Sequence, residues 1–172
     1  DDIFDYDTQN IPNVKESREA YKAFGKDPNR YRVSSEALIR RIGQGKGLYE
    51  VNTVVDVNNL ISLKSGFSVG SYDLSNLEGD LTFRIGKEGE MYKSIGKDEI
   101  KIEYLPVIAD NKGAVGSSTS DSERAMIRET TKEVLTLIYS FSDNQDLEAA
   151  LTYGEKYLKE YAFAQGVEAW IV

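Results

Sequence analysis

The sequence of 172 residues contains no histidine and no cysteine. Without histidine there is no imidazole acid–base catalysis, and without cysteine there are no thiolate nucleophiles and no disulfides. Cys/His zinc sites and iron–sulfur clusters are excluded as well. Any chemistry must therefore come from carboxyl, hydroxyl, amide, amine or guanidinium groups, or from the backbone.

Long apolar runs and excess positive charge are also missing. No apolar stretch approaches the roughly 18 residues that a membrane span needs. The 29 acidic side chains exceed the 21 basic ones and give a net charge of −8. This balance disfavours a protein that coats nucleic acid or an anionic membrane. We therefore expect a cytoplasmic protein without membrane contact, in which any RNA contact is local.

Charge is unevenly distributed along the chain. Residues 11–47 carry nine Lys or Arg against four acids, whereas residues 48–172 carry twelve against twenty-one. Two interpretations remain open for the basic stretch: solvated helix faces, or a footprint for an RNA backbone that includes Arg40 and Arg41.

The length suits a single domain, which we place at residues 11–172, after a frayed acidic tail at residues 1–10. Apolar spacing predicts four helices. The first is capped by Asn13 and ends at Gly25, and the second begins at Ser34 or Ser35 with Arg40 and Arg41 opposite its apolar side. Over residues 51–63 helix and strand patterns compete, and we favour a third helix from about Thr53. The fourth follows a cap at Asp143 or Asn144, with Gly154 as a weak position inside it.

Alternating and β-branched runs predict strands. These lie at residues 81–85, 100–109, 134–141 and 167–172. A polar loop is expected at residues 116–122 and a short helix at residues 123–130.

Few motifs in the chain indicate specific chemistry. The glycine-rich segment 113–117 is suited to close approach by a ligand, but it lacks the lysine of a phosphate-binding loop. No recognisable carboxylate loop for a cation is present, so we expect no metal and no cofactor. Asn58 and Asn59 are polar residues within an apolar segment; either they organise the fold by hydrogen bonding or they face a ligand.

An ordered set of motifs carries a resemblance to a known family. The set runs from VNTVVDVNNLISL at 51–63 through YDL at 72–74, GDLTFR at 79–84, GE at 89–90 and AD at 109–110 to GAVG at 113–116. In order and spacing it resembles the tRNA-binding and editing module, the third and fourth domains, of the phenylalanyl-tRNA synthetase beta subunit. Residues 31–41 and 121–132 also resemble the free-standing relatives of that module.

The resemblance implies an α+β fold with a mixed β-sheet core and flanking helices, and a pocket that in the synthetase hydrolyses tyrosine wrongly esterified to tRNA. It places the Thr-Asn pair of the bacterial pocket on Asn58 and Asn59. It places the glycine-rich wall on five consecutive residues: Gly113, Ala114, Val115, Gly116 and Ser117. We assign contacts with RNA phosphates to Arg40, Arg41, Arg84 and Arg124.

Two positions depart from the family pattern. Gly70 stands where the bacterial pocket has a histidine, and Leu137 stands where it has the glutamate that recognises the tyrosine hydroxyl. Three functions remain open: hydrolysis of mischarged aminoacyl-tRNA in trans, non-catalytic binding of tRNA or of an amino-acid-like ligand, and an interaction domain with a vestigial pocket. The residues do not identify the catalytic group.

Overall fold

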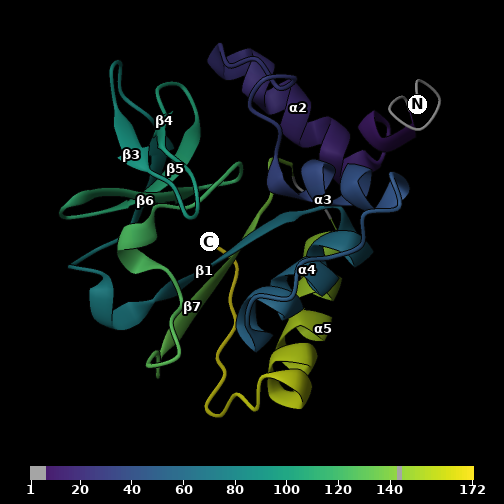
Figure 1. The fold of residues 1–172 in the computed structure, drawn as a ribbon, viewed down its shortest axis with the longest axis vertical. Helices are drawn as coiled ribbons and strands as arrows, with labels where there is room; N and C mark the ends of the chain where they lie inside the picture. The colour runs from purple at the N-terminus through teal and green to yellow at the C-terminus, as the bar shows by residue number, and fades with distance from the viewer. Residues whose placement is uncertain (1–6, 143–144) are drawn as a thin grey trace.

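The computed structural model describes residues 7–142 and 145–172 (Figure 1). The predicted caps Asp143 and Asn144 and most of the predicted tail lie outside the described residues. Residues 7–9 form a helical turn and Thr8 is buried, so the fray predicted for residues 1–10 does not extend over them.

Helix α2 (Pro12–Phe24) begins one residue before the predicted cap. Pro12 stands in the first turn, where its fixed φ fits the helix and its missing N–H is not needed. Asn13 does not cap the helix, because its side-chain amide instead donates to the carbonyl of Ser65, 2.6 Å away. Gly25 ends the helix in the left-handed conformation, as predicted.

Helix α3 (Ser34–Gly43) lies against α2 through charges rather than through its apolar side chains. Arg40 is buried and Ala37 is exposed, which reverses the faces expected from the sequence. The reason is Glu36, a fully buried carboxylate that draws Arg40 and Arg18 of α2 into the interior.

Helices α4 (Thr53–Ser65) and α5 (Asp146–Tyr161) pack against each other. The predicted start of α4 is confirmed, and Asn52 caps it by accepting a hydrogen bond from the amide of Val55. Gly154 of α5 is buried beside Ile61 of α4; a Cβ there would lie 3.1 Å from Ile61 Cδ1. This glycine therefore allows close approach of the two helices.

The α+β class is confirmed, but the strands form three small antiparallel sheets in the described residues instead of one mixed sheet. The sheets are β1 (Ser68–Asp73) with β7 (Val134–Tyr139), β5 (Pro106–Asp110) between β2 (Thr82–Ile85) and β6 (Gly113–Ser117), and β3 (Met91–Lys93) with β4 (Glu99–Lys101).

Four local predictions are corrected. The predicted strand at residues 100–109 is divided between β4 and β5, which belong to different sheets, because the chain turns at residues 102–105. Residues 167–172 form no strand and are mostly exposed, because this apolar run pairs with no other strand. Only Glu123–Ala125 is helical in the predicted short helix, as the 3₁₀ turn η2. Gly116 and Ser117 belong to β6, so the polar loop begins at Ser118.

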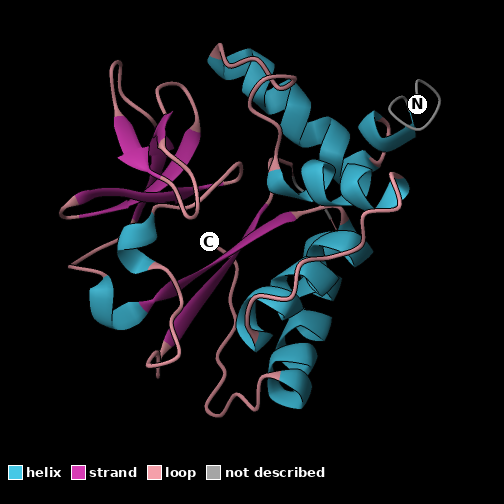
Figure 2. Cartoon of the chain, in the orientation of Figure 1, coloured by secondary structure: helices cyan, strands magenta, loops and turns pink. Residues whose placement is uncertain are grey.

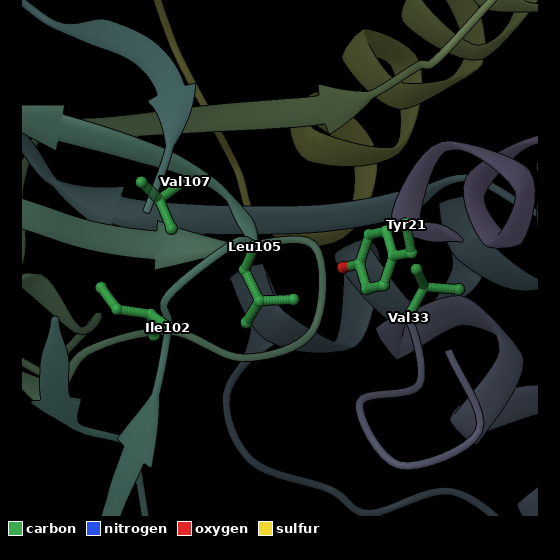
Figure 3. Packing of buried hydrophobic residues seen from close by; sticks show 5 residues of the cluster. All are labelled: Tyr21, Val33, Ile102, Leu105 and Val107. Atoms are coloured by element: carbon green, nitrogen blue, oxygen red, sulfur yellow. The ribbon is translucent and has the colours of Figure 1, made fainter. Parts of the chain in front are cut away.

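The β1–β7 pair crosses the middle of the molecule, with α4 and α5 on one side and the other two sheets on the other (Figures 1 and 2). Leu105 joins Ile102 and Val107 to Tyr21 and Val33 in one buried cluster (Figure 3). A second cluster packs β1 against β6 and η2, and consists of Tyr72, Ile108, Val115 and Ala125. No helix in the described ranges is long and apolar enough to cross a bilayer.

Candidate functional site

The segment 118–121, which follows β6, is contacted by hydroxyl groups from separate elements of the fold. Tyr21 of α2 lies 2.5 Å from the hydroxyl of Ser118 and 2.8 Å from that of Thr119. Tyr92 of β3 donates to the carbonyl of Ser120 at 2.6 Å. The segment is thereby fixed between the N-terminal helix and the β3–β4 sheet.

Asp121 ends this segment and contacts Tyr72, which in turn contacts Tyr139. The Tyr72 hydroxyl donates to Asp121 Oδ1 at 2.5 Å and lies 2.7 Å from the Tyr139 hydroxyl. We refer to Tyr72, Asp121 and Tyr139 as the Asp121 cluster. Desolvation raises the pKa of the Asp121 carboxyl to about 7, against the opposing effect of hydrogen bonds from Tyr72 and from the Ser117 amide. In a chain without histidine, this carboxyl can exchange a proton near neutral pH.

Gly70 and Gly116 explain why the Asp121 cluster fits where it does. A Cβ at Gly70 would lie 2.7 Å from the Tyr72 hydroxyl oxygen, and a Cβ at Gly116 would overlap that oxygen and crowd Asp121 Oδ1. The two glycines therefore leave room for the Tyr72 hydroxyl and the Asp121 carboxyl, and do not form an open wall for a ligand.

Two hydroxyl groups near the cluster lack a hydrogen-bond partner in the part of the chain that the structure describes. They are Ser94 Oγ, on a residue that is 1% exposed, and Ser120 Oγ. Ser94 forms a β-bridge with Ser122, and Ser120 precedes Asp121. Buried hydroxyls of this kind ordinarily bond to protein, water or ligand.

Asn58 lies on the opposite face of the β1–β7 pair. Its side-chain oxygen accepts a hydrogen bond from Ser71 Oγ at 3.0 Å, and Ser71 Oγ lies 2.7 Å from Thr136 Oγ1. Since side chains alternate along a strand, Ser71 faces α4 while Gly70 and Tyr72 face β6. Asn59 is half-buried, and its side chain makes no hydrogen bond within the described residues.

The predicted wall is strand β6, and its residues point in different directions. Gly113 opens the strand at φ +126°, and Ala114 packs against the first core cluster. Val115 is fully buried in the second cluster, and Ser117 Oγ donates to the Ser120 carbonyl at 2.9 Å. The structure thus does not bring Asn58 face to face with Gly116.

The structure brings together the two positions that depart from the family pattern. Gly70 and Leu137 are direct partners in the β1–β7 register. Leu137 packs against the cluster that contains Tyr72 and Val115. Positions 70, 137 and 116 therefore surround Tyr72 on one face of the sheet.

Three of the four arginines assigned to RNA phosphates are engaged with carboxylates. Arg124 binds both oxygens of Asp110, at 2.7 and 2.9 Å, and holds the pKa of that carboxyl well below its usual range. Arg84 binds both oxygens of Glu90 at the same two distances. Arg40 is buried, with its Nε 2.9 Å from Glu36.

Arg41 differs from these three, because no carboxylate pairs with it among the described residues. Its guanidinium donates to the carbonyls of Lys46 and Gly47 and lies 3.7 Å from the ring centroid of Tyr49, which is 62% exposed. A cation stacked on an exposed aromatic ring can contact both phosphates and bases.

The sequence pattern included Asp121 only as the first residue of the 121–132 stretch. Asp121 and Tyr72 are separated by 49 positions, and Tyr72 and Tyr139 by 67, so no local pattern joins them. The available signal was the resemblance itself, which included positions 72 and 121 without linking them.

The described residues contain no group of three or more Asp or Glu side chains that could hold a metal ion. The hydroxyl-rich surroundings of Asp121 likewise offer a single carboxylate.

Comparison with known proteins identifies related sequences. Residues 16–172 match the family model described as "B3/4 domain". The chain is 29% identical over 129 residues to the phenylalanine–tRNA ligase beta subunit of Aquifex aeolicus (strain VF5), covering 71% of this chain and 16% of that protein. It is 32% identical over 91 residues to the corresponding subunit of Bartonella henselae, covering 52% of this chain and 11% of that protein. The chain thus spans less than a fifth of the length of these relatives.

A solved structure has a similar fold. It is an N-terminal fragment of the phenylalanyl-tRNA synthetase beta subunit from Pyrococcus horikoshii, with a TM-score of 0.55 and 15% sequence identity. The similarity covers 63% of this chain and 40% of that fragment. At this identity the likeness concerns the fold alone.

Proposed function

This chain belongs to the B3/4 domain family, and from that premise we propose that it binds aminoacyl-tRNA and hydrolyses the aminoacyl ester in trans. The observation that carries the proposal is the family match over residues 16–172, together with relatives that are subunits of phenylalanine–tRNA ligase. We further propose that residues 11–172 act as one domain and that the protein works in the cytoplasm, where its proposed substrate is.

The proposed reaction needs little from the protein. Water adds to the ester carbonyl, the bond to the ribose oxygen breaks, and that oxygen regains a proton, which releases the amino acid and uncharged tRNA. An aminoacyl ester is an activated acyl group, so positioning and hydrogen-bond donors can supply much of the rate enhancement. A histidine is not required for this chemistry.

For the substrate contacts we retain the residues assigned from the sequence: Asn58, Asn59, Gly113, Ala114, Val115, Gly116 and Ser117. Asn59 and the start of β6 are the accessible members of this set, since Asn58 and Val115 are buried. We propose that a ligand contacts Asn59 or the start of β6. Asn58 would hold β1 in place through its hydrogen bond with Ser71.

Of the four assigned arginines, we propose that Arg41, stacked on Tyr49, is the principal contact with RNA. Arg84 and Arg124 keep 23% and 30% of their side chains exposed and can offer a free edge to a phosphate while bound to their carboxylates. Arg40 would have to leave Glu36, which we expect to be unfavourable.

A second candidate is non-catalytic binding of tRNA or of an amino-acid-like ligand. The observation that favours it is the pair Gly70 and Leu137, which lack the polar groups of the bacterial pocket. Such a module would retain affinity for its ligand and leave the ester intact.

One experiment separates the two candidates. The protein is incubated with a panel of correctly and wrongly charged tRNAs, ester loss is measured over time, and binding of the same tRNAs is measured by filter retention. Faster ester loss than in buffer for at least one tRNA supports hydrolysis. Binding without ester loss supports the second candidate, and neither binding nor loss contradicts both.

A further inference from the structure

Three carboxylates of this fold that are wholly or partly removed from water are paired with arginine. A buried carboxylate is costly unless a cation or several hydrogen bonds compensate it. The pairs in question are Glu36 with Arg18 and Arg40, Asp110 with Arg124, and Glu90 with Arg84.

Asp121 has no such partner. In the described part of the chain no Lys or Arg forms an ion pair with it, and the group that contacts its Oδ1 is the neutral Tyr72 hydroxyl. The nearest charges along the chain are already used: Glu123 pairs with Lys93 at 3.4 Å, and Arg124 binds Asp110.

We propose that Asp121 binds the ammonium group of an amino-acid-derived ligand, namely the free α-amino group of an aminoacyl ester. This rests on the proposed function for its choice of ligand. The ligand then supplies the cation that the protein does not.

The surroundings of Asp121 suit an ammonium group, which has three donors and no acceptor. A carboxylate accepts one of them, and hydroxyl oxygens can accept the others. Ser94 Oγ and Ser120 Oγ, which have no partner within the described residues, lie on segments adjoining Asp121. Asp121 is half-buried as a residue.

The groups around Asp121 predict how binding depends on pH. Tyr72 of β1, Tyr139 of β7 and Tyr92 of β3 all have a pKa above the ordinary value because of burial, so they stay neutral across the physiological range. The pairs Lys93–Glu123 and Arg124–Asp110 stay charged but compensate each other. Affinity should therefore rise as the pH increases from 5 to 7 and Asp121 ionises, and fall above about pH 8 as the α-amino group loses its proton.

The test compares ligands that differ only in this amine. The probes are a non-hydrolysable amide analogue of phenylalanyl-adenosine and its N-acetyl derivative, together with phenylalaninamide and its N-acetyl derivative to represent free amino-acid ligands. Each is titrated into wild type, Asp121→Asn and Asp73→Asn. Asp73 is the matched control, because it is also a buried aspartate bonded to hydroxyls, those of Ser75 and Thr131.

We expect wild type and Asp73→Asn to bind the free amines at least ten-fold more tightly than the N-acetyl derivatives. Asp121→Asn should lose this preference while its affinity for the N-acetyl derivatives stays the same. Equal affinity of wild type for both forms, a preference that survives in Asp121→Asn, or no binding of any probe at millimolar concentration would each overturn the inference. An Asp121-dependent preference in a protein that neither binds nor hydrolyses charged tRNA would support the inference and contradict the proposed function.

Discussion

Glu36 and Asp121 are both withdrawn from water, but only Glu36 has cations around it. Glu36 is fully buried between Arg18 and Arg40, whose nitrogens lie 2.8 and 2.9 Å from its oxygens. Asp121 meets the hydroxyl of Tyr72, which in turn contacts that of Tyr139. One carboxylate is compensated from inside the protein, and the other is not.

The difference separates a structural centre from a site. Glu36 joins α2 to α3, and breaking this join leaves two buried arginines without a counter-charge. Asp121 gains nothing comparable from its ionised form, as its raised pKa of about 7 reflects. A group whose charged state destabilises the fold is of a kind that recurs at functional sites.

Replacing Glu36 by Gln tests the structural side of this comparison and should have the largest effect. We expect the free energy of unfolding to fall by about 3–5 kcal/mol, because two buried guanidinium groups lose their carboxylate. Urea denaturation at pH 7 measures it. The control is Glu155→Gln, which removes an exposed i,i+4 pair with Lys159 and should change stability by less than about 0.5 kcal/mol. A loss below about 1 kcal/mol for Glu36→Gln would remove the contrast.

Replacing Asp121 by Asn should act in the opposite direction. Since folding raises the pKa of Asp121 to about 7, its protonated form stabilises the fold below about pH 4, and this stabilisation is lost as the pH rises through 7. At pH 8 the Asn variant should therefore be more stable than wild type, by on the order of 2–4 kcal/mol.

The pH series carries the check on Asp121→Asn. Urea denaturation between pH 4 and pH 8 should give a gap between the variant and wild type that widens with pH. A variant that is less stable than wild type at pH 8 would show that the ionisation of Asp121 near pH 7 does not destabilise the fold. A gap that stays constant with pH would show the same.

Gly116→Ala tests how closely the Asp121 cluster is packed. The new Cβ would overlap the Tyr72 hydroxyl, so we expect a loss of about 1–3 kcal/mol from overpacking. In a Tyr72→Phe background the overlap with the hydroxyl is gone, but the new Cβ still lies 2.6 Å from the ring carbon Cζ of residue 72 and still crowds Asp121 Oδ1, so the loss should shrink only in part. A double-mutant cycle from thermal or urea unfolding measures the coupling. Additive effects would show that Asp121, rather than the Tyr72 hydroxyl, sets the constraint at Gly116.

Local sequence signals predicted the elements well where one pattern dominated. The strand around Phe83 and the strand from Val134 follow from the apolar pattern, and the structure confirms them. Near Thr53 helix and strand patterns competed, and the structure confirms the favoured helix. Prediction was wrong where tertiary contacts overrode the pattern. Arg40 turned inward because Glu36 is buried, and the apolar residues 167–172 found no strand to pair with.

The candidate site was less predictable than the fold. The resemblance named Asn58 and the 113–117 segment, but it carried no information on which face of the β1–β7 pair each would occupy. That depends on the register of β1 against β7 at Ser71 and Tyr72. A shift of one residue would exchange the two faces of the strand. The lack of a cation beside Asp121 is a property of its surroundings, so only the structure reveals it.

Tyr139→Phe should have the smallest effect of the four substitutions, because it removes a neutral hydroxyl and keeps the buried ring. Tyr72 still donates to Asp121, so we expect a loss of about 0.5–1.5 kcal/mol and an unchanged pH dependence of stability. Tyr72→Phe is the informative partner. It removes a hydrogen bond that lowers the pKa of Asp121, so the pKa of this carboxyl should rise further. The fall in stability with increasing pH should then extend to higher pH than in wild type. Urea denaturation of both variants at pH 5 to 9 distinguishes them. If Tyr139→Phe moves the pH dependence as much as Tyr72→Phe does, the two tyrosines act on Asp121 as one unit, and the direct bond from Tyr72 is not what sets its proton affinity.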